Sequence, residues 1–343
     1  MEKPEFVYGN EKRFFEFISN LGGEKIALIS HTDLDGLGAA KVANEALNAD
    51  VVKLIKYELI DEKLVRQLKN EKVKKIVMCD IFVHENFIKA LEKNFEVLII
   101  DHHPTIKDYN SEKVTFINAQ GMCAAYICYY LFSKIQDIEK LDWLIACSCI
   151  ADFCWYNNQE FLSKVFEKYG DKFELNGKVI RESGKFWDLQ WNIILALIYF
   201  AGNEKKVFDS IGQEFGELGG LERHVTEVRD YLDDCIKKFW KEKQEINGRY
   251  FWEFTPKFKV GSLVSNMVSL NVRDRTFIIG RIDGNGLYHF SCRRQDKGED
   301  MNLLAKKMVS GLRDFGGGGH IAAAAGHVLL KEREKLLERL KKL

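Results

Sequence analysis

The chain of 343 residues lacks the features that mark several classes of protein. It contains only three prolines and no low-complexity tract, which argues against a disordered or repetitive chain. Lysine plus arginine and aspartate plus glutamate number 51 each, so the formal net charge is zero. This balance weighs against a protein that coats long nucleic acid, because a basic surface supplies most non-specific affinity. It leaves open a short nucleotide substrate held by a local patch and by metals.

Signals for export or membrane insertion are also missing. No apolar stretch reaches the length of a membrane span, and no signal peptide is recognisable, so we expect a cytoplasmic protein with no membrane partner. The eight cysteines show no regular disulfide spacing. Cys147, Cys149 and Cys154 lie close in sequence but contain no C-x-x-C pair, which favours buried thiols over a metal cluster.

The pattern of apolar segments predicts an α/β protein. Short apolar runs that read as buried strands alternate with segments of helical character. The predicted strands are 25–30, 51–56, 74–79, 95–100 and 114–117, and the helices between and after them are 61–70, 84–93, 122–133 and 143–152. This alternation is typical of a doubly wound parallel sheet.

The length favours more than one domain, and the pattern changes twice along the chain. We predict a catalytic domain over 1–156, a helical connector over 157–248 and a smaller C-terminal α/β domain with a mixed sheet over 249–343. In the last domain, strands 275–282 and 287–293 flank a turn whose Asn285-Gly286 pair is a strong hairpin signal.

Candidate metal ligands follow three of the predicted strands. The first strand leads into His31, Asp33 and Asp35, the third ends at Asp80, and the fourth ends at Asp101-His102-His103. A further acid, Asp152, interrupts an apolar helix, where a carboxylate is costly unless it is paired or bound to metal. The carboxyl ends of parallel strands form the usual binding crevice of such sheets, and carboxylate with imidazole suits divalent transition metals such as manganese.

A purely structural interpretation of these residues also exists. Asp33 and Asp35 could cap a helix, and the two histidines could lie on the surface. That interpretation does not explain why acids and histidines concentrate at successive strand ends. The set is large enough for two metals about 3.5–4 Å apart, a recurrent arrangement for hydrolysing phosphate esters.

A second group of candidates lies near the C-terminus. Four consecutive glycines, Gly316 to Gly319, precede His320 and let backbone N–H groups approach an anion closely. The alternative is a flexible turn before a packed strand. Arg293 and Arg294, at the end of a predicted strand, could pair with phosphate or remain solvated surface residues.

In these motifs and their order the chain resembles the DHH phosphoesterase family with its C-terminal DHH-associated domain. The resemblance rests on the segments 33–36, Asp80, 101–103, Asp152, 291–293, 316–320 and 324–326, which span nearly the whole chain. It implies two Mn²⁺ ions per active site, with Mg²⁺ or Co²⁺ as substitutes, in a cleft between the domains.

The resemblance also implies a role for each candidate. One metal would take His31, Asp33 and Asp80, and the other Asp35, Asp80, His102 and Asp152, with Asp80 bridging. His103 would contact the scissile phosphate and Asp101 would orient the histidines. The substrate's terminal phosphate or base would meet Arg293, Gly317, Gly318, Gly319 and His320.

The implied function is a manganese-dependent phosphodiesterase that uses two-metal activation of a bridging water. Its substrates would be di- to oligonucleotides, or linear or cyclic dinucleotides such as cyclic di-AMP, cut to nucleoside monophosphates. Three alternatives stay open: a RecJ-type single-strand exonuclease, an adenosine 3′,5′-bisphosphate phosphatase, and a nucleic-acid-binding scaffold without catalysis. A homodimer is compatible with the resemblance.

Overall fold

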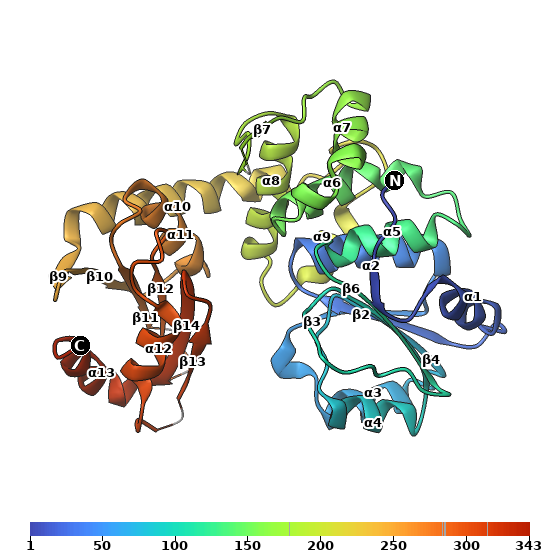
Figure 1. The fold of residues 1–343 in the computed structure, drawn as a ribbon, viewed down its shortest axis with the longest axis horizontal. Coiled ribbons are helices and arrows are strands. Elements are labelled where there is room, and N and C mark those ends of the chain that lie inside the picture. The colour runs from blue at the N-terminus through green and yellow to red at the C-terminus, as the bar shows by residue number, and fades with distance from the viewer. Residues whose placement is uncertain (178, 283, 285, 314) are drawn as a thin grey trace. The chain divides into compact units, whose positions relative to one another are not determined.

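The computed structural model describes residues 1–177, 179–282, 284, 286–313 and 315–343, with the backbone alone at Glu58 (Figure 1). The chain forms two compact units, Met1–Glu222 and Arg223–Leu343. The predicted boundaries after 156 and 248 do not coincide with this division, because residues 157–222 pack with the first unit and 223–248 with the second. No helix in the described ranges is both long and apolar enough to cross a membrane.

The first unit is built on a six-stranded sheet in the order β1-β6-β5-β4-β2-β3. Its strands are β1 (Phe6–Tyr8), β2 (Ile26–His31), β3 (Val51–Ile55), β4 (Lys75–Cys79), β5 (Glu96–Asp101) and β6 (Val114–Ala119). All neighbours are parallel except β1, which pairs antiparallel with β6 at one edge. The chain therefore passes from β2 to β3 on one side and to β4 on the other, which makes the β2–β4 gap a topological switch point.

Helices cover both faces of this sheet (Figure 1). The longer helices are α1 (Glu11–Ser19), α2 (Leu34–Leu47), α3 (Glu62–Asn70), α4 (Glu85–Glu92), α5 (Ala124–Phe132) and α6 (Asp142–Ala151). α3 and α4 pack on one face, where they share an apolar core with the strands, and α2 and α5 pack on the other. The doubly wound parallel sheet is thus confirmed, although β1 and α1 had no clear sequence signal.

The rest of the first unit is mainly helical and packs on the α2 side. It contains α7 (Gln159–Lys168), the strand pair β7 (Leu175–Asn176) and β8 (Val179–Ile180), α8 (Lys185–Tyr199) and α9 (Glu204–Ser210). α6 lies against both α2 and α8, so this region continues the helical layer above the sheet.

The second unit is a six-stranded mixed sheet in the order β13-β14-β12-β11-β10-β9, with only β10 and β11 parallel. Its elements are α10 (Glu222–Glu242), β9 (Gln244–Ile246), β10 (Arg249–Phe254), α11 (Gly261–Asn271), β11 (Phe277–Ile282), β12 (Leu287–Arg293), α12 (Met301–Val309), β13 (Gly316–Gly319), β14 (Ala323–Leu329) and α13 (Arg333–Leu340). Ile278 shares a core with α12 and α13, whereas the Phe277 ring lies 5.7 Å from that of Phe239 on α10. Successive strand residues face opposite sides, so both faces of the sheet are covered.

The second unit contains the predicted hairpin and the tetraglycine segment. β11 and β12 pair antiparallel as the hairpin prediction requires, but Asp283 and Asn285 of the predicted turn lie outside the described residues. The tetraglycine was expected as a loop and is instead the edge strand β13, paired with β14 from Gly316↔His327 to Gly319↔Ala324. Glycine suits this edge because a Cβ at Gly319 would lie 2.4 Å from the Ala323 carbonyl oxygen.

The contact between α2 and α6 depends on a glycine. A Cβ on Gly38 would lie 2.4 Å from Ser148 Oγ and 3.1 Å from the Ala125 Cβ. Ser148 Oγ is itself 3.1 Å from the carbonyl oxygen of Leu34 in the first turn of α2. Close approach of the two helices therefore holds the start of α2 in place, and that start carries candidate site residues.

We expect Gly38→Ala to destabilise the first unit by about 1–3 kcal/mol, since the added methyl group overfills a packed contact. The free energy of unfolding in urea would measure this. Ser148→Ala removes the nearest clashing atom, so in the double variant the loss should be smaller than the sum of the two single losses. Strictly additive losses would contradict this account of the α2–α6 contact.

Candidate metal centre

The turn after β2 presents the first candidates. Asp33 is the N-cap residue of α2, and its Oδ1 accepts a hydrogen bond of 2.9 Å from the Gly36 N–H, as the structural interpretation expected. Its other oxygen lies 2.8 Å from His31 Nδ1, so the cap leaves one carboxylate oxygen at the site. A Cβ at Gly36 would lie 2.5 Å from the His31 carbonyl oxygen, so only glycine permits this tight entry into the helix.

Asp80 occupies the centre of the edge formed by the strand ends. It follows β4, which lies between β2 and β5, and its side chain is only 3% exposed. Its backbone has a φ of 55°, a left-handed conformation that costs energy for a non-glycine residue, and its N–H donates to the Ile100 carbonyl at 3.0 Å. The neighbouring strand thus holds Asp80 in a strained conformation that aims its carboxylate into the site.

The end of β5 supplies the two histidines. Asp101 is buried, and its Oδ1 lies 2.7 Å from His103 Nδ1, which fits the orienting role expected from the sequence. Asn118 on β6 donates from Nδ2 to the His103 carbonyl at 3.0 Å. The ring of His102 points instead toward the carboxylates of the neighbouring strands and helices.

Helices bring in the remaining acids. Both oxygens of Asp35, in the first turn of α2, accept hydrogen bonds of 2.8 Å from Ala124 N–H and Ala125 N–H at the start of α5. The contact is favourable because a helix N-terminus offers free N–H groups and partial positive charge. Asp152 is the C-cap residue of α6, and its Oδ2 lies 3.6 Å from His102 Nδ1.

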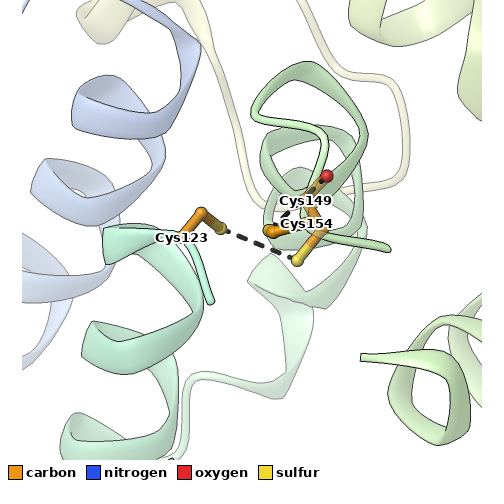
Figure 2. A group of neighbouring side chains, drawn as sticks. All are labelled: Cys123, Cys149 and Cys154. Carbon is orange, nitrogen blue, oxygen red and sulfur yellow. Dashed lines mark hydrogen bonds between the residues drawn. The ribbon is translucent and has the colours of Figure 1, made fainter. Parts of the chain in front are cut away.

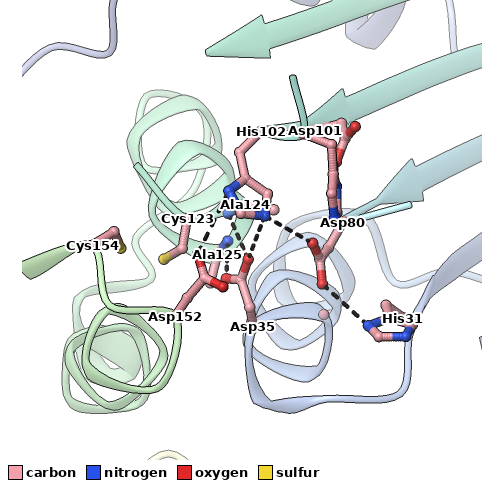
Figure 3. A network of polar contacts seen from close by, with 12 residues as sticks. His31, Asp35, Asp80, Asp101, His102, Cys123, Ala124, Ala125, Asp152 and Cys154 are labelled. Atoms are coloured by element: carbon pink, nitrogen blue, oxygen red, sulfur yellow. Dashed lines mark hydrogen bonds and ion pairs between the residues drawn. The ribbon is translucent and has the colours of Figure 1, made fainter. Parts of the chain in front are cut away.

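All six predicted metal ligands converge at this edge, and Figure 3 labels five of them, His31, Asp35, Asp80, His102 and Asp152. They form two neighbouring sets of donor atoms, His31–Asp33–Asp80 and Asp35–His102–Asp152. Asp80 joins the sets, because one of its oxygens is 3.8 Å from His31 Nδ1 and the other is 3.4 Å from His102 Nε2. His102 Nε2 is also 3.8 Å from Asp35 Oδ2.

This donor set fits divalent cations. Asp80 Oδ2 is buried and has no hydrogen-bond partner among the described residues, and the buried His31 Nδ1 faces carboxylate oxygens of Asp33 at 2.8 Å and Asp80 at 3.8 Å. Burial and four neighbouring carboxylates raise the pKa of Asp80 well above its usual value. Burial is likewise the main cause that raises the pKa of Asp35 to about 6 and that of Asp152 to about 8. Such repulsion is what bound cations would relieve, and oxygen and imidazole ligands suit Mn²⁺ or Mg²⁺.

The predicted substrate-binding residues gather at one end of the second unit's sheet. Arg293 at the end of β12 is opposite Ala323, and Gly319 is opposite Ala324 on the same strand β14. The exposed His320 follows β13, and its N–H donates to the Ala323 carbonyl at 2.7 Å. Arg294 forms an ion pair of 2.7 Å with Asp296, which favours the surface interpretation for that residue.

Tyr57, which follows β3, lies at the site although it was not among the residues predicted from the sequence. Its ring centroid lies 4.6 Å from that of His31, and its hydroxyl is 3.2 Å from His103 Nε2. Tyr57 thus contacts two candidate site residues from different strands. Its position just after β3, a parallel neighbour of β2, could have indicated that it lies near the site. Any polar residue at that position would carry the same indication, so it did not single out Tyr57.

Comparison with family models identifies both parts of the chain. The DHH family N-terminal domain matches residues 25–152, and the DHHA1 domain matches residues 255–343. Asp152 is the last residue of the first match, so that match spans all six candidate ligands. A comparison with curated protein sequences gives no match.

Solved structures share the fold at low sequence identity. An exonuclease RecJ bound to manganese is 15% identical with a TM-score of 0.70, over 99% of this chain and 94% of that one. RecJ from Thermus thermophilus with Mn²⁺ is 15% identical with a TM-score of 0.69, over 97% of this chain but 54% of that longer protein. CDC45 from Entamoeba histolytica is 9% identical with a TM-score of 0.65, over 98% and 99% of the two chains.

The crowded acids predict an unusual pH dependence for the metal-free protein. Asp35, Asp80 and Asp152 bind their protons more tightly when folded than the ordinary value of 3.8. The folded state therefore holds more protons, and stability should fall as pH rises from about 4 to about 8. Asp80→Asn removes the central charge and tolerates the left-handed backbone, so it should raise the metal-free unfolding temperature at pH 8 and flatten its pH dependence.

Unfolding temperatures with and without Mn²⁺ complete this experiment. Mn²⁺ should stabilise the wild type strongly at pH 8 and Asp80→Asn much less, because the variant lacks the carboxylate that joins the two donor sets. Equal stabilisation of both proteins, or a metal-free variant less stable than the wild type, would contradict the assignment of Asp80.

Proposed function

We propose that this chain, a member of the DHH family of metal-dependent phosphoesterases, hydrolyses short nucleotide chains to nucleoside monophosphates, with Mn²⁺ as its cofactor. The observation that carries the proposal is the pair of donor sets joined by the buried Asp80. Two cations bound there would supply a hydroxide nucleophile and offset charge on the reacting phosphate. His31, Asp33, Asp35, Asp80, His102 and Asp152 would hold them.

The residues around His103 support phosphate binding beside the metals. Asp101 accepts from Nδ1 of the imidazole, and the Tyr57 hydroxyl lies at Nε2. Both ring nitrogens thus have a fixed partner, and the ring is about one-third exposed. Where Nε2 donates to the Tyr57 oxygen, the phenol proton is left for a phosphate oxygen that approaches this face.

An exposed aromatic ring supports a nucleotide as the substrate. Phe153 directly follows Asp152, is 71% exposed and has a left-handed φ of 57°. Its ring centroid is 5.4 Å from that of Trp155. Strain and exposure of a large apolar side chain are both costly, and a nucleobase that stacks on the ring would compensate for them.

The zero net charge and the composition shape the rest of the proposal. Without a surplus of basic residues, a short substrate is favoured over a long strand. Arg293 and the end of β13 near His320 would bind the substrate's terminal phosphate or base. All eight cysteines are free thiols, which fits a reducing compartment such as the cytoplasm.

A substrate panel tests the proposal directly. The protein would be incubated with Mn²⁺ and, separately, a dinucleotide, a short RNA oligomer, cyclic di-AMP, adenosine 3′,5′-bisphosphate and a long single strand, with products resolved by chromatography. We expect rapid release of monophosphates from the shortest chains, little loss of the long strand, and no turnover in Asp80→Ala.

Other outcomes would replace the proposal with a specific alternative. Progressive loss of the long strand with a strong salt dependence would indicate a RecJ-type exonuclease. Release of inorganic phosphate from the bisphosphate alone would indicate a phosphatase. Binding without turnover under any divalent metal would indicate a scaffold that has lost catalysis.

Tyr57→Phe isolates the phenol hydroxyl. The variant keeps the ring beside His31 and loses one donor, so kcat/KM for the best substrate should fall roughly 5–10-fold, the effect of one hydrogen bond. Stabilisation by Mn²⁺ should stay at the wild-type level, because the hydroxyl lies at His103 and not at a proposed ligand. Unchanged kinetics, or a loss of Mn²⁺ stabilisation, would remove Tyr57 from this role.

A further inference from the structure

Three cysteines meet at the ends of two helices (Figure 2). They are Cys123 before α5, Cys149 in α6 and Cys154 after it, and their sulfurs all lie within 4.8 Å of one another. The sequence had grouped Cys147 with Cys149 and Cys154. In the structure the third member of the group is Cys123 and not Cys147. Cys123 is distant in sequence, so the spacing of the cysteines could not predict it.

The spacing of the sulfurs suits a shared metal ion. Cys123 Sγ and Cys149 Sγ are 3.7 Å apart. A Zn–S bond of about 2.3 Å and a tetrahedral angle place two sulfurs about 3.8 Å apart. The cysteines Cys79 and Cys128 make a similar contact of 3.6 Å, but no third sulfur joins them among the described residues, so that pair is ordinary packing of buried thiols.

A helix end and a buried amide border the three sulfurs. Cys123 is the N-cap residue of α5, and its side chain makes no capping hydrogen bond to that helix. Asn158 is fully buried, and its Nδ2 lies 3.7 Å from Cys149 Sγ and 3.6 Å from Cys154 Sγ. The same Nδ2 donates to the Cys154 carbonyl at 3.0 Å, so one amide group fixes the Cys154 backbone beside both sulfurs, as an outer-shell donor does in a metal–thiolate site. Asn158 Oδ1 is buried with no partner in the described part of the chain.

We propose that Cys123, Cys149 and Cys154 form a second, separate metal site that binds one thiophilic d¹⁰ cation of the Zn²⁺ type. Binding forms three metal–sulfur bonds and releases the thiol protons to solvent, and zinc accepts water in a fourth position. Cys154 is 9% exposed while the other two are fully buried, so the ion enters on the Cys154 side.

The site would also brace the carboxylate–histidine centre. Cys123 immediately precedes Ala124, whose N–H binds Asp35, and Cys154 follows Asp152 by two residues (Figure 3). One cation on the three sulfurs would link the start of α5 to the end of α6, and thereby the segments that position two proposed ligands. The proposal of a metal site on the three cysteines holds whether or not the proposed substrate is correct.

Cobalt(II) distinguishes this site from the other, because only thiolate ligands give sulfur-to-cobalt charge-transfer absorption in the near ultraviolet. Metal-free full-length protein would be titrated with Co²⁺ without oxygen, in excess Mg²⁺. We expect the absorption to rise to a plateau and to disappear when Zn²⁺ is added. Cys149→Ala should lose it, whereas Cys147→Ala, a buried cysteine on the same helix but outside the group, should keep it.

A thermal measurement gives an independent readout. Zn²⁺ at about 100-fold above its Kd should raise the unfolding temperature of wild type and Cys147→Ala by roughly 5–10 °C, and that of Cys149→Ala much less. If Cys149→Ala does not fold, Cys123→Ala replaces it as the variant that removes one sulfur ligand. Wild-type protein without charge-transfer absorption, or absorption that persists in the Cys123 and Cys149 variants, would overturn the proposal and leave three packed thiols. Neither readout requires phosphoesterase activity, so the result stands whatever the substrate panel shows.

Discussion

Mutual repulsion among buried carboxylates is the constraint on which the first unit depends. Asp80 lies almost fully buried among four other acids, and burial with their charges opposes its ionisation. A fold that only needed stability would place apolar residues there. The sheet instead brings these acids together where parallel strands end, and bound protons or bound cations offset their repulsion.

Local hydrogen bonds and backbone conformations hold these acids in place against their repulsion. Hydrogen bonds from α5 hold both oxygens of Asp35, and Gly36 lets the chain turn tightly from His31 into α2. Asp80 stays in a left-handed conformation because β5 fixes its N–H. Asp35 and Asp80 are thus placed by backbone contacts that do not require the cation, which preorganises this part of the site.

Much of the fold was predictable because its strands are buried on both faces. Continuous apolar runs made β2 to β6 visible in sequence to within one or two residues, and the acids at their ends indicated the crevice. β1 and α1 were missed because a three-residue edge strand has little pattern of its own. The tetraglycine was misjudged because a glycine strand has no side-chain alternation, and only its pairing with β14 defines it.

The sequence by itself determined the fold class, the candidate ligands and their family, because ligand types at successive strand ends form a pattern along the chain. Tertiary structure alone decided which atoms meet. It joined the two donor sets through Asp80, brought Tyr57 to His103, and placed Cys123 with Cys149 in α6 and Cys154 just after that helix. The physical reason is that strand order and helix packing bring together residues distant in sequence, and no local pattern of residues records such contacts.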